Sequence, residues 1–113
     1  MNDRKALIDE YKNRKKIGGV YKITNTRTGS YFLDCATDLA AKQNSFNFMV
    51  SSGTCFHHRL KHDWDTFGPA VFVFGMVEEL EMKEGQTAAG FQEDLQVLKQ
   101  IWVEKSDPLL SYG

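Results

Sequence analysis

The sequence predicts an α+β fold in which helices flank a small three-stranded antiparallel sheet. Three observations support it: two short β-branched and aromatic segments surround a turn, a third run is dense in Val and Phe, and the other segments place apolar residues three and four positions apart. The expected order is helix, two strands, two helices, strand, helix. With 113 residues, 42% of them hydrophobic, and no repeat or linker, we expect one domain over residues 1–113.

The first part of the chain predicts a short helix followed by a β-hairpin. Residues 3–15 place apolar side chains at helical spacing, and the glycines at positions 18 and 19 end that segment. Residues 20–25 and 31–35 are rich in β-branched, aromatic and apolar types, and the residues between them are typical of a turn. We therefore expect strands one and two here, joined by a loop of four or five residues.

The second part predicts two helices, a strand and a final helix. Thr37 or Asp38 can cap a helix that extends to residue 50, and residues 55–67 predict another that a Gly-Pro pair ends. Residues 70–77 are best explained as a third, well-buried strand. The last helix has a packing face that repeats at three- and four-residue steps: Phe91, Leu95, Leu98 and Trp102.

Composition argues against membrane and disulfide-rich classes. The longest apolar run is too short to cross a bilayer, and the N-terminal residues are too charged for a signal peptide. We expect a soluble, cytoplasmic protein with no membrane partner. Cys35 and Cys55 are too few for a disulfide framework and are interpreted as free thiols.

Charge is distributed unevenly along the chain. Residues 1–62 hold 11 Lys or Arg against 5 Asp or Glu, whereas residues 63–113 hold 3 against 10. A fold that gathers the first group would make a surface that attracts phosphate; the alternative is two solvated faces without a ligand. The candidate residues are Arg14, Lys15, Lys16, Lys22, Arg27, Arg59 and Lys61.

Three segments together give the chain a likeness to a known family. They are "GVYKITNTRTGSYFL", "DLAAK" and "LKHDWDTFGPAVFVFGMVEELE", and over residues 17–105 they resemble the GIY-YIG nuclease domain. The resemblance implies a domain that cuts DNA phosphodiester bonds. It also implies a tyrosine from each of two motifs near the scissile phosphate, an arginine on the next helix, and a glutamate on a later helix that holds one divalent metal ion.

The chain keeps the first motif of the family and differs from the second. Tyr21 matches the first tyrosine, in an acid, base or water-positioning role. Where Tyr-Ile-Gly is expected, the chain has Phe32, Leu33 and Asp34, so the second phenol is lost and a negative charge is added. Tyr31 is adjacent, but side chains alternate across a strand, so we expect it on the opposite face.

The chain also differs from the family at the position of the helix arginine and at that of the metal-binding glutamate. Lys42 replaces the arginine, keeping a positive charge without the bidentate fork. His57 stands where the family carries a polar residue, at the edge of the predicted helix face. Lys99 or Gln100 takes the place of the metal-binding glutamate, and a cation there would repel the ion.

These departures predict a degenerate GIY-YIG-like domain with a nucleic-acid-binding or regulatory role and little or no nuclease activity. The remnant site is Tyr21, Lys42 and His57. No cofactor is expected; Mg²⁺ or Mn²⁺ would be needed only for residual hydrolysis. The residues expected to bind nucleic acid are Lys15, Lys16, Lys22, Arg27, Lys42, Arg59 and Lys61.

Three alternatives stay open. The domain can be a protein-interaction module that does not bind nucleic acid. It can also be a weak endonuclease with a rearranged site involving Asp34, Glu93 or Asp94. A third possibility is a metal site at Cys55, His58 and His62, but that spacing is a weak signal because it offers no obvious fourth ligand.

Overall fold

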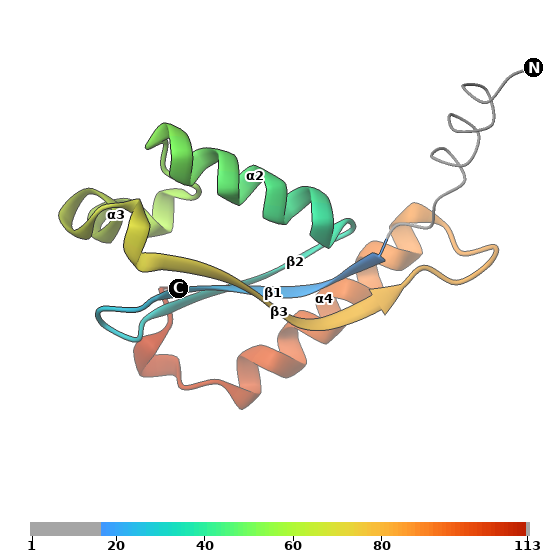
Figure 1. Ribbon diagram of the computed structural model, residues 1–113. Helices are drawn as coiled ribbons and strands as arrows, with labels where there is room; N and C mark the ends of the chain where they lie inside the picture. Colours follow the sequence, from blue (N-terminus) through green and yellow to red (C-terminus); the bar gives the residue numbers. More distant parts are fainter. Residues whose placement is uncertain (1–16, 113) are drawn as a thin grey trace, which may run out of the picture.

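A computed structural model describes residues 17–112 (Figure 1). The helix predicted for residues 3–15 lies outside the described residues, and so do the basic candidates Arg14, Lys15 and Lys16. In chain order the main elements are β1 (Ile17–Asn25), β2 (Tyr31–Ala36), α2 (Leu39–Ser52), α3 (Lys61–Phe67), β3 (Phe72–Glu81) and α4 (Ala88–Lys105). Short 3₁₀ turns lie at η1 (His58–Leu60), η2 (Pro69–Val71) and η3 (Pro108–Leu110).

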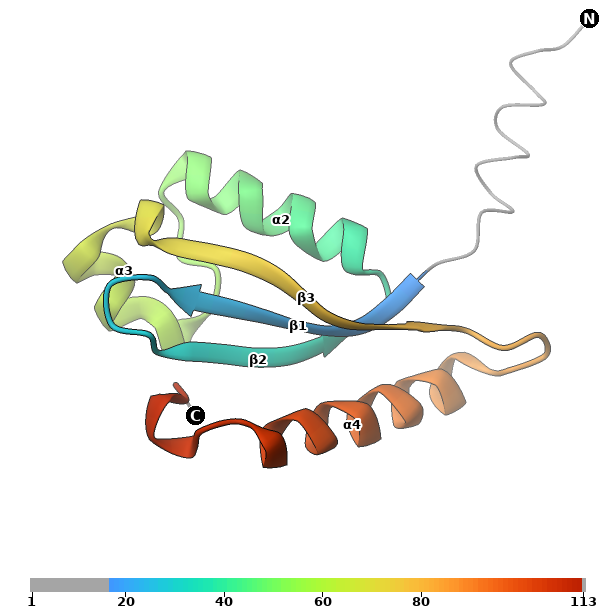
Figure 2. The ribbon, with the colours of Figure 1, turned by 60° about the horizontal axis from the view of Figure 1, so that its bottom comes forward.

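The three strands form one antiparallel sheet in the order β2-β1-β3, which confirms the predicted fold class. Both views show α2 and α3 on one side of the sheet and α4 on the other (Figures 1 and 2). Because neighbouring residues of a strand point to opposite faces, each strand contributes to two separate cores. Among residues 17–112, no helix combines the length and apolar character that crossing a bilayer requires.

The larger core lies between the sheet and the pair α2–α3. Ile23 and Phe72 pack there with Leu39 and Phe46 from α2 and with Trp64 from α3. The smaller core lies under α4 and joins buried strand residues to the predicted packing face of that helix. It comprises Val20, Tyr31 and Leu33 with the partly buried Leu98 and Trp102.

Helix α2 has the boundaries that its flanking residues dictate. The Asp38 side chain accepts a hydrogen bond from the Ala41 N–H at 3.1 Å, which identifies Asp38, not Thr37, as the cap. Gly53 ends the helix with φ 76°, a left-handed conformation that glycine adopts without strain.

Two predicted elements have different bounds from those expected. The helix predicted for residues 55–67 is wrong at its start: the chain is extended at His57, η1 follows, and α3 begins at Lys61. The third strand is Phe72–Glu81, two residues later at its start and longer at its end than predicted. It is also mostly exposed instead of well buried, because β1 takes the centre of the sheet and leaves β3 at an edge.

A polar network fixes the far end of the hairpin. Asn25 is fully buried; its side-chain oxygen accepts from the N–H groups of Arg27 and Thr28, and its amide donates to Asp63 and to the Tyr112 hydroxyl. The Tyr112 hydroxyl donates to Asp63 at 2.6 Å. One buried amide therefore ties together the β1–β2 turn, α3 and the C-terminal segment.

Candidate functional site

Tyr21 lies in the middle of the sheet on the α2–α3 face. Its ring stacks on Phe74 with centroids 5.1 Å apart and meets Phe56 edge-on at 6.3 Å. The side chain is 1% exposed, and its hydroxyl donates a long hydrogen bond of 3.5 Å to Asp34. Burial first, and then the negative charge of Asp34, raise the pKa of Tyr21 far above its usual value. The hydroxyl is therefore a protonated, enclosed donor.

Asp34 and Lys99, two of the altered motif positions, form an ion pair. The Lys99 Nζ lies 3.2 Å from the Asp34 Oδ1, which also accepts from the Cys35 N–H at 2.8 Å. β2 is an edge strand, so a side chain from α4 reaches Asp34 around the edge of the sheet. Tyr21, Asp34 and Lys99 thus form a continuous chain of contacts. Of the two candidates for the metal position, Lys99 faces the site, whereas Gln100 bonds to Glu104.

The second-motif residues divide between the two faces as predicted. Phe32 packs in the larger core, its ring centroid 6.5 Å from that of Tyr21, whereas Tyr31 and Leu33 lie in the smaller core under α4. The Tyr31 hydroxyl donates to the Asp107 carbonyl at 2.9 Å. Tyr31 therefore does not supply the missing phenol.

His57 brings a group of positive charges to the edge of this site. Its ring lies over Phe32 with centroids 4.5 Å apart, and its Nδ1 accepts from the Arg59 N–H, which holds the chain extended before η1. Partial burial lowers the pKa of His57, and the charges of His58, Arg59 and Lys42 lower it further against the opposing effect of Asp34. We call Lys42, His57, His58 and Arg59 the η1 basic cluster.

Lys42 belongs to both the cluster and the aromatic cover of Tyr21. Its Nζ is 5.7 Å from the ring centroid of Phe56, within the range of a cation–π contact. Since Phe56 in turn meets Tyr21 edge-on, the ammonium group lies above the rings that enclose the phenol. The remnant positions Tyr21, Lys42 and His57 therefore share one face of the sheet.

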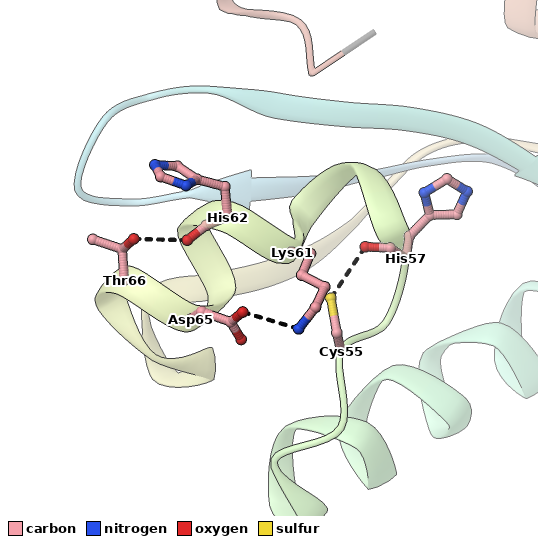
Figure 3. Close-up of polar contacts among 6 residues, drawn as sticks. All are labelled: Cys55, His57, Lys61, His62, Asp65 and Thr66. Atoms are coloured by element: carbon pink, nitrogen blue, oxygen red, sulfur yellow. Dashed lines mark hydrogen bonds and ion pairs between the residues drawn. The ribbon is translucent and has the colours of Figure 1, made fainter.

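The other basic residues do not gather at this cluster. Lys22 lies on the α4 face, its Nζ 4.9 Å from the ring centroid of Tyr31, and Arg27 is exposed in the β1–β2 turn. Lys61 pairs with Asp65 at 2.9 Å on the surface of α3 (Figure 3). Of the described candidates, Lys42 and Arg59 are those that lie beside the remnant site.

A divalent metal ion does not fit the residues around Tyr21. The carboxylate of Asp34 already holds the Lys99 ammonium, and a second cation at that distance would be repelled. Residues 17–112 bring no three His, Cys, Asp or Glu side chains together in a metal-binding group. The thiol of Cys55 donates to the His57 carbonyl, and the His62 ring projects away from it (Figure 3). Glu93 and Asp94 are exposed, and Asp94 accepts from Gln86.

Sequence reasoning missed Gln96. Its amide donates to the Cys35 thiol at 3.4 Å, one helical turn before Lys99, so α4 contacts the end of β2 at two points. The signal was the three-residue spacing of Gln96 and Lys99, which places both on one side of a helix. Cys35 and Cys55 are both free thiols, as predicted.

A three-stranded antiparallel sheet between α2–α3 and α4 is the fold of the GIY-YIG nuclease catalytic domain. The catalytic domain of the homing endonuclease I-TevI matches this chain with a TM-score of 0.62 at 17% identity, over 84% of this chain and 95% of that one. A mutant of the intron endonuclease I-TevI catalytic domain gives 0.62 at 16%, over 86% and 92%. No protein-family model and no curated protein matches the sequence. Identities this low establish the fold alone.

Proposed function

We propose that the protein binds nucleic-acid phosphates at the η1 basic cluster and does not hydrolyse them by the nuclease mechanism. The observation that carries the second part of this proposal, the absence of hydrolysis, is the chain of contacts from Tyr21 through Asp34 to Lys99. Phosphodiester hydrolysis needs an activated water and a cation directed at the phosphate. Here the phenol is enclosed, and the cation at the metal position is neutralised by a carboxylate 3.2 Å away.

The cluster beside this chain keeps its positive charge available. Among residues 17–112 the ion pairs engage Lys61 and Lys99, which leaves Lys42 and Arg59 without an acidic partner there. A phosphate group bound at the cluster would also stabilise protonated His57, whose pKa is lowered from its usual value of 6.5 in the free protein by burial first and then by the surrounding cations. Binding is therefore expected to strengthen as the pH falls through and below 6.5.

The test is a fluorescence-anisotropy titration of labelled duplex and branched DNA at low and high salt, with and without Mg²⁺. Lys42→Glu and Arg59→Glu should weaken binding. Lys83→Glu makes the same charge change in the exposed turn after β3 and should leave binding unchanged. Each phosphate contact removed by Lys42→Ala or Arg59→Ala should reduce the slope of log K against log salt by about 0.9.

Three results would contradict the proposal. Absence of binding at low salt would make the cluster a solvated surface, and equal losses in all three charge-reversal variants would mean that only net charge matters. Nicking of plasmid DNA that requires Mg²⁺ or Mn²⁺ and disappears in Tyr21→Phe would instead establish an endonuclease with a rearranged site.

A further inference from the structure

A groove runs between α2 and the edge strand β3. Figure 2 shows these two elements side by side, and the groove between them has a volume of about 510 Å³, within the usual range for ligand sites. Its floor is aromatic, with Phe46, Phe72 and Phe74. Amide and hydroxyl side chains at four-residue spacing on α2 form its rim: Gln43, Asn47 and Ser51. The groove therefore combines an apolar floor with groups that can donate and accept hydrogen bonds.

The two outer strands of the sheet, β2 and β3, differ in how far other segments cover their edges. On β2 the Tyr112 N–H donates to the Tyr31 carbonyl at 2.9 Å, and α4 contacts Asp34 and Cys35. Within residues 17–112, β3 pairs only with β1, so the outward-facing backbone groups of residues 72–76, of which 72–74 line the groove, have no strand partner there. Open strand edges are templates for another strand, and folded proteins usually protect them. In the described part of this chain, the β2 edge is covered and the β3 edge is open along residues 72–76.

We propose that this groove binds an extended peptide segment of a protein partner, which adds as a fourth strand antiparallel to β3. Alternate side chains of such a strand would enter the groove, and its backbone would pair with the open edge. Apolar side chains suit the floor formed by Phe72 and Phe74. The peptide binds beside α2 and β3, a surface different from the η1 basic cluster, so the inference does not depend on nucleic-acid binding.

The charge of β3 identifies the polarity of the peptide. The first half of the strand is apolar, whereas its second half and the following turn carry the exposed carboxylates of Glu79 and Glu84; Glu78 accepts from the Trp102 indole N–H on the α4 side. A peptide antiparallel to β3 places its N-terminal residues beside this acidic half, so we expect Lys or Arg there. A second copy of β3 fits less well, because full antiparallel pairing would set each acidic half beside an apolar half.

The probe is a fluorescein-labelled peptide, Lys-Lys-Thr-Val-Thr-Val-Thr-Ile, titrated into the full chain by anisotropy. We expect a Kd below about 1 mM and at least tenfold weaker binding when the sequence of the peptide is reversed. N-methylation of alternate residues should abolish binding for the set whose N–H groups face β3 and spare the other set. NMR shift changes should centre on residues 72–76 and the facing residues of α2.

Asn47→Trp fills the groove from its exposed rim and should weaken peptide binding at least tenfold. Asn44→Trp is the matched control, since Asn44 is exposed on α2 and does not line the groove. DNA binding should be the same in both variants. The proposal is overturned if no peptide binds at 1 mM, if both variants lose binding equally, if N-methylation shows no alternation, or if sedimentation shows that two copies associate through β3.

Discussion

Replacing Tyr21 with phenylalanine isolates one buried hydroxyl. Tyr21→Phe keeps the ring between Phe56 and Phe74 and removes only the 3.5 Å hydrogen bond to Asp34. The other oxygen of Asp34 still accepts the hydrogen bond from the Cys35 N–H and still pairs with the Lys99 ammonium group. At pH 7 the free energy of unfolding should therefore change by less than about 1 kcal/mol.

At high pH the two proteins should diverge. The pKa of Tyr21 is raised in the folded protein, by burial and then by Asp34, whereas in the unfolded chain the phenol ionises near its usual value of 10.0. Between these two pKa values the unfolded state binds fewer protons than the native state, so stability falls as the pH rises. At pH 11 this loss is about 1.4 kcal/mol in the wild type and absent in Tyr21→Phe.

Urea unfolding followed by the fluorescence of Trp64 and Trp102, at pH 8, 9, 10 and 11, measures the difference. The same comparison of Tyr21 with Tyr21→Phe should also be made in a protein that carries Asp34→Asn. This substitution removes the charge that contributes to the raised pKa, so the native state should begin to lose the proton at a lower pH and the divergence should shrink. A constant difference between wild type and Tyr21→Phe from pH 8 to 11 would refute the reasoning.

Three further predictions concern packing, capping and backbone approach. Leu95→Ala, at a fully buried position, should lower the free energy of unfolding by about 2–5 kcal/mol. Val97→Ala, at a position that is 61% exposed, should lower it by less than about 0.5 kcal/mol. Urea denaturation measures both changes, and similar losses in the two variants would contradict the assigned packing face. Asp38→Ala should lower stability by about 1 kcal/mol through loss of the α2 cap, with Asp38→Asn restoring most of it. Gly19→Ala should prevent folding as judged by near-ultraviolet circular dichroism, because a Cβ there would lie 2.0 Å from the Glu78 carbonyl oxygen; a folded variant would show that the strands separate readily.

Local signals were sufficient for part of the fold. The hairpin and α2 follow from residues that determine backbone conformation themselves, such as the cap Asp38 and the stop Gly53. Residues 55–60 were misassigned to an α-helix because Phe56 and Leu60 continue the four-residue spacing that leads to Trp64. The His57 ring instead accepts from the Arg59 N–H, and the chain is extended at His57. The length of β3 was underestimated because glutamates in residues 78–81 suggested a loop, whereas an exposed edge strand accommodates charged side chains.

The site was predictable in its positions but not in its contacts. Sequence motifs identified Tyr21, Asp34 and Lys99 as separate matches or departures, and no local pattern says that the last two form an ion pair. That contact depends on β2 lying at the sheet edge and on the direction in which α4 crosses beneath it. The same limit applies to Asn25, whose partners are set by where α3 and the C-terminal segment arrive.

The Asn25–Asp63–Tyr112 network has a consequence for the order in which the protein folds. The Tyr112 hydroxyl accepts from the Asn25 amide and donates to Asp63, and the Tyr112 N–H donates to the Tyr31 carbonyl. The two hydroxyl contacts join residues 87 and 49 positions apart in the sequence, whereas the hairpin and α2 depend on contacts between near neighbours. The hairpin and α2 can therefore form early, and the Asn25 amide lacks one of its two partners until the segment that carries Tyr112 has docked.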